Sequence, residues 1–384
     1  MPGVRLVRRS VEIPAASWDA LAGPGDFYLT TPWLATLEET SGAAMGYLLA
    51  EDPGAGGPTD ALTGGLAGGL ATALAEVSAP WLSGRPDTLL ARCVRESRPG
   101  AEQYQAQLPP DLAGALMPAL VCGGRHLGRT RLLSADGPGA RNTAERLLAS
   151  AERLAVARGA RSVAFLYVDE EDVELRQLLE ARGYAGFQSS VYCRMTLPPG
   201  GFESYLSRFS SVRRRSVLAE RRRLARAGVE VRVEPLTSEA IPRLAELEAE
   251  LLTKYGMTWT AAQSELILRR ALAGLGRDAL VSVARSGADV LGFALLLRHR
   301  DQWFAHRAGF DYEAQGRLPV YFEALFYALA EEAPAAGVTG VHYGTGSAEA
   351  KVSRGCTAAD LYAYVLRLDG PPPGADGQRP TVPE

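Results

Sequence analysis

The feature that most constrains this chain is an internal repeat of about 170 residues. In the first copy, a helical stretch ends at Gly159 and a run rich in Val and Phe follows, and Gly337 takes the same place in the second copy. Farther on, Arg182-Gly183 and Arg354-Gly355 each precede one more strand. A repeat of this length is too long for a solenoid, whose units span about 20–50 residues. We therefore expect two duplicated domains.

Hydrophobic periodicity predicts that both halves end in the order helix, strand, short helix, strand. The predicted helices and the strands that follow them span residues 141–158, 162–168, 318–336 and 339–343. Upstream in the second half, strands are predicted at residues 229–234, 279–284, 290–298 and 303–310, with two helices after the first strand. In the first half, strands are predicted at residues 69–77 and 117–133. The fold class is thus α+β, with two tandem domains that each hold a mixed, mostly antiparallel sheet flanked by helices.

The turn Pro198-Pro199-Gly200-Gly201 lies between the two halves. We place the first domain at residues 1–198 and the second at residues 199–370. Residues 371–384 are rich in Pro and Gly and are predicted to be a disordered tail. Residues 52–65 have a similar composition and are predicted to form a loop.

Composition narrows the class of protein. Hydrophobic residues make up 47% of the chain and charged residues 22%, as in ordinary globular proteins. No secretory signal is visible and no apolar run reaches about 18 residues, so we expect a cytoplasmic protein without membrane insertion. The four cysteines form no CxxC pair and there are only four histidines, so no metal site is expected. The oligomeric state is left open.

The segment from Phe202 to Arg226 carries eight arginines and two glutamates, a local charge of +6 in a chain whose net charge is −3. Projected as one helix, it has Tyr205, Phe209 and Val212 on one side and most arginines on the other. Arginine binds phosphate well because its planar fork bonds two oxygens at once. The segment therefore predicts a phosphate-binding surface made of Arg213, Arg214, Arg215, Arg221 and Arg222. The alternative is a solvated helix paired to acidic neighbours such as Glu239, Glu246 and Glu248.

Three segments resemble a known family. The basic segment ends in Ala227-Gly228-Val229, His306-Arg307-Ala-Gly309 lies in a predicted strand, and Gly344-Thr-Gly346 is followed by Lys351 and by Arg354-Gly355. This last spacing is similar to the Gly-x-Gly-x-x-x-x-Lys-x-x-Arg-Gly pattern of the FemAB/FemX-like (peptidoglycan-biosynthesis-like) branch of the GNAT acyltransferase superfamily. The resemblance covers roughly residues 202–366, and it implies two tandem GNAT-like domains whose central strands splay apart to hold an acyl donor.

The resemblance also implies an activity. Fem-type enzymes transfer an activated aminoacyl group to an amine and so form an amide. The expected donor is aminoacyl-tRNA, the expected acceptor is a small-molecule or peptide amine, and the setting is cell-wall or natural-product biosynthesis. Two alternatives stay open: an acetyl-CoA-dependent GNAT N-acetyltransferase and a non-catalytic ligand-binding protein. No bound cofactor is expected, since aminoacyl-tRNA or acyl-CoA would act as co-substrate.

The glycine-rich loop with which GNAT enzymes hold the CoA pyrophosphate is poorly matched. The backbone N–H groups of that loop bind the anion at a helix N-terminus. In the first half the corresponding stretch is Gly137-Pro138-Gly139, where the proline removes one N–H. In the second half Leu318 and Pro319 stand where glycines should be. This argues against CoA in the second domain and leaves it open in the first.

The candidate catalytic residues lie in the second half. Lys351 could stabilise negative charge on the acyl carbonyl or hold the donor, and Arg354 could bind phosphate three residues farther on. Removal of a proton from the attacking amine needs a base, for which Glu323, His306 and His342 are candidates.

An acceptor pocket is predicted from aromatic residues of the same half: Tyr255, Trp259, Trp303, Tyr321 and Tyr343. For each of these residues the alternative is an ordinary place in the core. No nucleophile with a matching base is found, so we expect direct transfer without a covalent enzyme intermediate.

Overall fold

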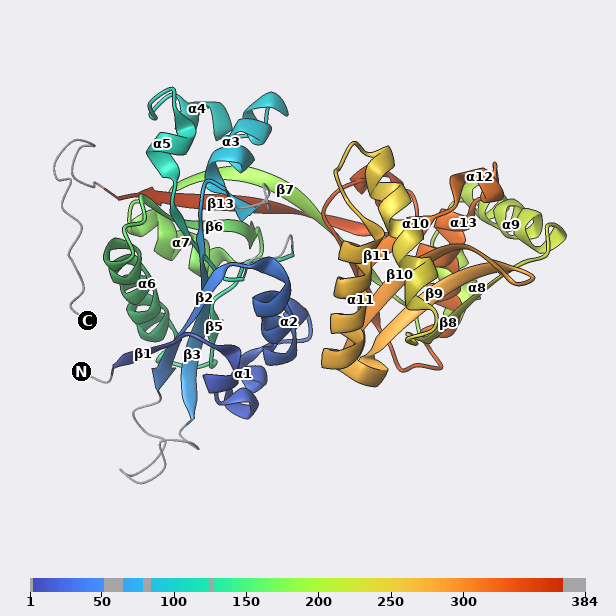
Figure 1. Cartoon of the computed structure of the whole chain (residues 1–384), viewed down its shortest axis with the longest axis horizontal. Helices are drawn as coiled ribbons and strands as arrows, with labels where there is room; N and C mark the ends of the chain where they lie inside the picture. Colours follow the sequence, from blue (N-terminus) through green and yellow to red (C-terminus); the bar gives the residue numbers. More distant parts are fainter. Residues whose placement is uncertain (1–2, 52–64, 79–83, 125–127, 369–384) are drawn as a thin grey trace.

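The computed structural model describes residues 3–51, 65–78, 84–124 and 128–368. Most of the predicted loop at 52–65 and all of the predicted tail at 371–384 lie outside the described residues. Figure 1 shows two lobes joined by two long strands. The two halves of the chain build these lobes in the same order, as the repeat predicts.

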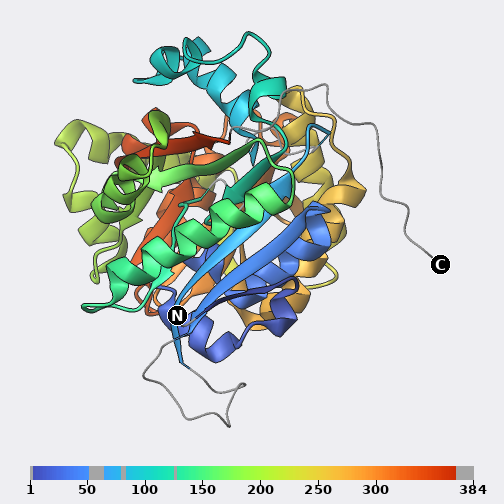
Figure 2. The same cartoon turned by 90° about the vertical axis from the view of Figure 1, so that its left-hand side faces the viewer.

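The first lobe packs helices on both faces of its part of the sheet (Figure 2). Its strands are β1 (Val4–Val7), β2 (Ala44–Glu51), β3 (Leu66–Ala75), β4 (Ala119–Cys122), β5 (Leu133–Ser134), β6 (Ser162–Asp169) and β7 (Ala185–Thr196). Its helices are α1 (Ala15–Leu21), α2 (Thr31–Ser41), α3 (Pro86–Arg95), α4 (Ala101–Gln105), α5 (Leu112–Leu116), α6 (Ala140–Ala157) and α7 (Val173–Ala181). Short 3-10 turns lie at Ser10–Glu12 (η1) and Phe27–Leu29 (η2).

The second lobe follows the predicted element order. Its strands are β8 (Val229–Pro235), β9 (Ala279–Ser286), β10 (Asp289–His299), β11 (Gln302–Phe310), β12 (Gly340–Gly344) and β13 (Thr357–Arg367). Its helices are α8 (Gly201–Ser207), α9 (Ser211–Arg226), α10 (Ile241–Lys254), α11 (Ala261–Leu275), α12 (Tyr312–Gln315), α13 (Val320–Phe322), α14 (Ala328–Glu332) and α15 (Ala348–Val352), with η4 at Gly276–Asp278. Alternating buried residues in β8–β11 place one face of the sheet on α8–α9 and the other on α10–α11.

All thirteen strands of the described chain belong to one sheet, in the order β1-β2-β3-β4-β6-β13-β7-β12-β11-β10-β9-β8, with β5 beside β3. The two lobes share the antiparallel pair of β7 and β13. β13 starts in the second lobe and ends beside β6, while β7 starts in the first lobe and ends beside β12. The sheet therefore runs through the predicted boundary at residue 198, and that boundary stays a prediction.

The lobes also share one hydrophobic cluster. Phe27, Tyr28 and Trp33 of the first lobe pack with Phe304 of β11 and with residues of α10 and α11. The rings of Phe27 and Phe304 have centroids 5.2 Å apart, and those of Tyr28 and Phe304 are 5.5 Å apart. The first lobe thereby covers one face of the second lobe's sheet, so this face offers no separate opening to solvent at Phe304.

Two predicted helices differ from the structure. The basic segment is two helices rather than one. The side chain of Ser210 accepts a hydrogen bond from the backbone N–H of Arg213 and so caps a new helix, α9, which does not continue α8. Val212, which the single-helix projection placed on the apolar side, is 67% exposed. The predicted helix at 318–336 is interrupted by a π-helical turn, η5 (Glu323–Tyr327), between α13 and α14. A π-turn is invisible to a 3.6-residue periodicity because it inserts one residue into a continuous helix.

A glycine sets how closely α10 approaches the sheet. A Cβ on Gly309 of β11 would lie 2.4 Å from the carbonyl carbon of Leu247 and 2.4 Å from the backbone nitrogen of Glu248. We expect Gly309→Ala to lower the free energy of unfolding by about 1–3 kcal/mol, because α10 must move away from β11. Urea unfolding measures this difference.

The matched control is Gly139→Ala, at a glycine with nothing within 4 Å of an added methyl group. It should change the free energy of unfolding by less than about 1 kcal/mol. Equal stability of the two variants would contradict the close packing of α10 on β11.

Candidate active site in the second lobe

The second lobe opens between its two parallel strands. β11 and β12 pair only at Gln302–Gly340, Trp303–Val341 and Phe304–His342, and beyond the last pair they separate. An extra residue lies on each side of the gap: His306 has no partner in β10, and Tyr343 has none in β7. Such bulges redirect side chains and end strand pairing, often beside active sites. The gap lies between the central strands, where the family resemblance predicted a cleft for the acyl donor.

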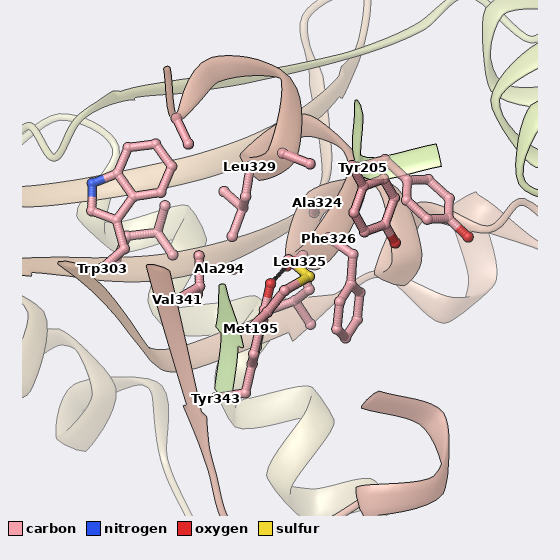
Figure 3. Packing of buried hydrophobic residues seen from close by; sticks show 14 of the residues in the cluster. Met195, Tyr205, Ala294, Trp303, Ala324, Leu325, Phe326, Leu329, Val341 and Tyr343 are labelled. Atoms are coloured by element: carbon pink, nitrogen blue, oxygen red, sulfur yellow. Dashed lines mark hydrogen bonds between the residues drawn. The ribbon is translucent and has the colours of Figure 1, made fainter. Parts of the chain in front are cut away.

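Tyr343 follows the last pair of β11 and β12 and is buried in the hydrophobic core beside Leu325 and Phe326 (Figure 3). Its hydroxyl donates a 2.6 Å hydrogen bond to the carbonyl of Leu325, and its ring stacks on Phe326 with centroids 4.8 Å apart. Both partners belong to the π-helical turn η5. Burial raises the pKa of the Tyr343 phenol well above its ordinary value, so the hydroxyl stays a neutral donor. The tyrosine thus ties β12 to the π-turn, a feature that occurs frequently at functional sites.

Lys351 is buried beneath the loop that follows β12. Its Nζ donates to the carbonyls of Tyr343 at 2.7 Å, Thr345 at 2.9 Å and Gly344 at 3.3 Å. No described carboxylate pairs with it, and burial lowers the pKa of its ammonium group. All three donors of the ammonium group thus have carbonyl partners. The geometry makes Lys351 the residue that holds the loop, and its predicted contact with a donor stays a prediction.

Arg354 is also buried, at 4% exposure. Its Nη2 pairs with Glu220 of α9 at 3.1 Å, its Nε donates to the hydroxyl of Tyr327 at 2.6 Å, and its guanidinium lies over the ring of Phe322. Tyr327 in turn donates to Glu220. This network fixes α9 against the π-turn. Because its fork is already engaged, Arg354 is not arranged as a free phosphate ligand here.

Glu323, the first residue of the π-turn, is paired to the basic helix. Its carboxylate accepts from Nε of Arg221 at 3.1 and 3.2 Å, and Arg221 also pairs with Glu331. Burial raises the pKa of Glu323, and the charge of Arg221 opposes that shift. Of the predicted donor-binding arginines, Arg221 and Arg354 are therefore neutralised by glutamates.

The other six arginines of α9 form no ion pair with any described carboxylate: Arg213, Arg214, Arg215, Arg222, Arg223 and Arg226. The acidic neighbours suggested by the sequence are engaged elsewhere. Glu246 pairs with Arg243, Glu248 pairs with Arg307, and Glu239 accepts from Ser238. None of these three glutamates pairs with α9, whereas Arg221 is paired to Glu323 and Glu331, so the positive charge of α9 rests on the other six arginines.

Two of the predicted pocket residues lie at the open end of the gap. Tyr321 packs against Phe310 with ring centroids 5.5 Å apart. The pKa of the Tyr321 hydroxyl is raised to about 12, mainly by burial and next by Tyr255. Tyr255 is 70% exposed, and the pKa of Tyr312 is raised first by burial and next by the neighbouring Tyr255. Tyr255, Tyr312 and Tyr321 thus form an aromatic mouth outside Tyr343.

The two predicted tryptophans are elsewhere. Trp303 precedes the gap, is 1% exposed and belongs to the hydrophobic core, so it has no surface to offer a ligand. Trp259 donates to Ser264 at 2.9 Å, and the guanidinium of Arg307 lies 5.4 Å from its ring centroid. Trp259 is therefore on the α10–α11 side of the sheet, away from Tyr343.

The two candidate histidines lie at the junction of the lobes. The ring of His342 stacks on Phe304 at 4.3 Å, and its Nδ1 is 3.1 Å from the hydroxyl of Tyr192. Nδ1 of His306 is 3.5 Å from the hydroxyl of Tyr28. Burial lowers the pKa of His342 to about 3, so this ring is neutral at neutral pH. A role for either histidine as a base stays a prediction.

Some residues of the site were missed by sequence reasoning. Glu220 and Tyr327 complete the buried network of Arg354, and Glu248 pairs with Arg307 while 2% exposed. The only sequence signal for Glu220 was a glutamate inside an otherwise basic segment. No described group of three or more His, Cys, Asp or Glu side chains could hold a metal ion, and no described helix is long and apolar enough to span a membrane.

His342 makes stability depend on pH. The unfolded state takes up a proton near pH 6.5, whereas the folded state does so only at about pH 3. Stability contributed by the neutral ring is therefore complete above pH 6.5 and is lost as the pH falls toward 3. We expect His342→Gln to flatten the acid side of the urea-stability profile by up to about 1.4 kcal/mol per pH unit. Parallel profiles between pH 7 and 4 would contradict this role.

Lys351 has a natural control, since Lys254 is the only other lysine of the chain. Lys351→Met keeps the apolar stem and leaves three carbonyls without their donor, so we expect a loss of about 1–3 kcal/mol in unfolding free energy. Lys254 is exposed and lies 3.2 Å from the Tyr312 ring centroid, so Lys254→Met should cost less than about 1 kcal/mol. A Lys351→Met protein as stable as wild type would show that the ammonium group does not hold the loop.

Comparison with known proteins agrees with this geometry. A family model described as an acetyltransferase (GNAT) domain matches residues 211–352. The structure of FemX superposes with a TM-score of 0.62 at 14% identity, over 95% of this chain and 98% of that one.

A conserved protein of unknown function from Bacteroides thetaiotaomicron superposes with a TM-score of 0.54 at 12% identity, over 96% of this chain and 100% of that one. None of the curated protein sequences matches significantly. Residues 211–352 thus match a GNAT domain model, and the chain shares its overall fold with FemX.

Proposed function

We propose that this protein is an amide-forming acyltransferase that takes an aminoacyl group from aminoacyl-tRNA and transfers it to an amine acceptor. The observation that carries the proposal is the surface of α9, where six arginines have no described carboxylate partner. The fold supports acyl transfer in general. The choice of donor rests on the charge of this helix and on its position beside the gap.

The arginine surface suits a polyanion that lies along a helix. Arg215, Arg222 and Arg226 are exposed and fall within about 40° of one another on the helical projection of α9. A folded RNA presents phosphates along an extended surface, and binding releases the counterions that surround them. A single CoA pyrophosphate would engage only one or two of these arginines. The extended stripe therefore favours RNA over a nucleotide.

Helix α9 adjoins the mouth of the gap. Arg223 donates to the carbonyl of Arg317 at 2.7 Å, and Arg317 lies in the turn between α12 and α13. Tyr312 begins α12, so the aromatic mouth is next to the basic helix (Figure 1). Unpaired bases at the end of an RNA strand stack on exposed aromatic side chains. In this proposal the acceptor stem lies on α9, and its terminal base reaches Tyr255.

The chemistry is aminolysis of an ester. The acceptor nitrogen attacks the ester carbonyl, the C–N bond forms, the bond to the terminal ribose oxygen breaks, and the proton lost by the amine ends on that oxygen. Glu323 is the candidate base in this proposal: burial raises the pKa of its carboxyl group, and the ion pair with Arg221 opposes that shift. Lys351 acts indirectly, because it holds in place the loop of Tyr343–Thr345 that borders the gap. No covalent enzyme intermediate is needed.

The proposal is tested by a mobility shift with aminoacylated and deacylated tRNA over a series of salt concentrations. We expect the wild type to bind, with an affinity that falls as salt rises. The variant Arg215→Ala/Arg222→Ala/Arg226→Ala should bind at least about tenfold more weakly and should reduce the slope of log K against log salt by about two to three.

The matched control changes the same number of charges on other surfaces. Arg5, Arg269 and Arg270 are exposed and already paired to Glu51, Glu265 and Glu39. Their replacement by Ala should leave the tRNA affinity within about twofold of wild type. Absence of a shift at low salt, or equal weakening by both triple variants, would overturn the choice of tRNA as donor.

A further inference from the structure

The sheet ends in the second lobe at β8, which pairs with β9 on one side and with no other described strand. An edge strand exposes backbone N–H and C=O groups that can pair with another chain. Val229, Val231 and Val233 of β8 pack toward α8 and α9. Side chains alternate along a strand, so Glu230 and Arg232 lie on the opposite face, where both are exposed.

The hydrogen bonds of β8 show which backbone groups point outward. The N–H of Val233 donates to the Glu332 carboxylate at 3.1 Å, so it faces away from β9. The N–H of Leu236 donates to the carbonyl of Ala279, the first residue of β9. Because these directions alternate in an antiparallel ladder, the N–H and C=O of Val231 also point outward, and no described residue bonds to them. Val231 is thus a free pairing position at the middle of the edge.

The two residues that flank Val231 carry opposite charges. The Glu230 and Arg232 side chains are 77% and 73% exposed, and their charged groups lie 3.8 Å apart. If a second copy of β8 pairs antiparallel with Val231 opposite Val231, Glu230 of each copy lies opposite Arg232 of the other. Opposite charges directly across a ladder stabilise it, and like charges destabilise it. The edge is therefore complementary to itself in this register.

Other registers fit less well. A shift of two residues in one direction sets Glu230 opposite its own copy, and a shift in the other direction sets Arg232 opposite its own copy. A register centred on Val233 again opposes unlike charges, but that N–H is held by Glu332, and Pro235 has no N–H to donate. An equal shift the other way runs past the start of β8. The register centred on Val231 is thus favoured by both charge and hydrogen bonding.

A groove beside this edge gives room to the side chains of a second copy. Its lining includes Leu218 of α9, Val231 and Val233 of β8, and Glu332 of α14. Directly opposed residues of an antiparallel pair lie on the same face of a sheet, so Val231 of the second copy enters the groove. The Val233 N–H then exchanges Glu332 for the carbonyl of Val229 of the second copy, and no backbone group is left without a partner.

We propose that β8 is a self-association surface, at which two copies of this chain join their sheets antiparallel about Val231. The occupant is a second copy because the order of charges in β8 fits its own reverse. The inference does not depend on the tRNA donor, since Glu230 and Arg232 belong neither to α9 nor to the gap between β11 and β12.

The experiment is analytical ultracentrifugation of the full chain without RNA, over a series of protein concentrations. Physiological salt limits repulsion between the two basic helices, because screening then acts over about 8 Å. We expect a monomer–dimer equilibrium for the wild type. Glu230→Lys places a lysine opposite Arg232 of the other copy, and Arg232→Glu opposes two glutamates, so each variant should dimerise at least about tenfold more weakly.

Mixing the two variants tests the register itself. In a mixed dimer, each altered residue lies opposite an unlike charge of the other chain, so an equimolar mixture should dimerise within about threefold of the wild-type affinity. Both positions are exposed, and circular dichroism confirms that each variant is folded.

The matched controls are Glu265→Lys and Arg269→Glu, which reverse an exposed ion pair on α11. They should leave the dimerisation constant within about twofold of wild type. A wild type that stays monomeric at every concentration would overturn the proposal. So would a dimer that neither reversal in β8 weakens, or one that the mixture does not restore. The experiment contains no RNA, so its failure and the failure of the tRNA proposal are seen separately.

Discussion

The antiparallel pairing of β7 with β13 is the interaction on which the rest of the structure depends. Each of these strands begins in one lobe and ends in the other, so each lobe completes its sheet with a strand from the opposite half of the chain. Backbone hydrogen bonds of a sheet are obligatory for buried strands. Neither lobe can therefore turn away from the other without breaking the ladder. The hydrophobic cluster of Phe27, Tyr28 and Phe304 adds side-chain packing to this backbone connection.

That fixed connection explains how the gap between β11 and β12 is kept open. β12 pairs with β7 on its far side, and the bulge at Tyr343 turns its end away from β11. Tyr343 then ties β12 to the π-turn, and Lys351 holds the loop that follows. On the other side, Gly309 lets α10 lie directly on β11. The gap is thus bordered by groups whose positions are set by packing rather than by a ligand.

Charge is divided between the lobes. Six arginines of α9 have no described carboxylate partner, whereas a first-lobe cavity between β5 and the first turns of α6 and α7 is lined by four carboxylates and two guanidinium groups. A net charge of −3 conceals both features. The two surfaces therefore have opposite electrostatic character.

The sequence by itself determined the duplication, the order of helices and strands in the second half, and the concentration of arginine between Phe202 and Arg226, because these follow from local periodicity and composition. It also singled out Lys351 and Glu323, though not their partners. Only the tertiary structure decided that β7 and β13 are shared, and that Arg221 and Arg354 are neutralised while six arginines of α9 are not. Residues that pair across 100 or more positions leave no local pattern, and a π-turn or a bulge shifts the register without changing the residue types that signal a helix or a strand.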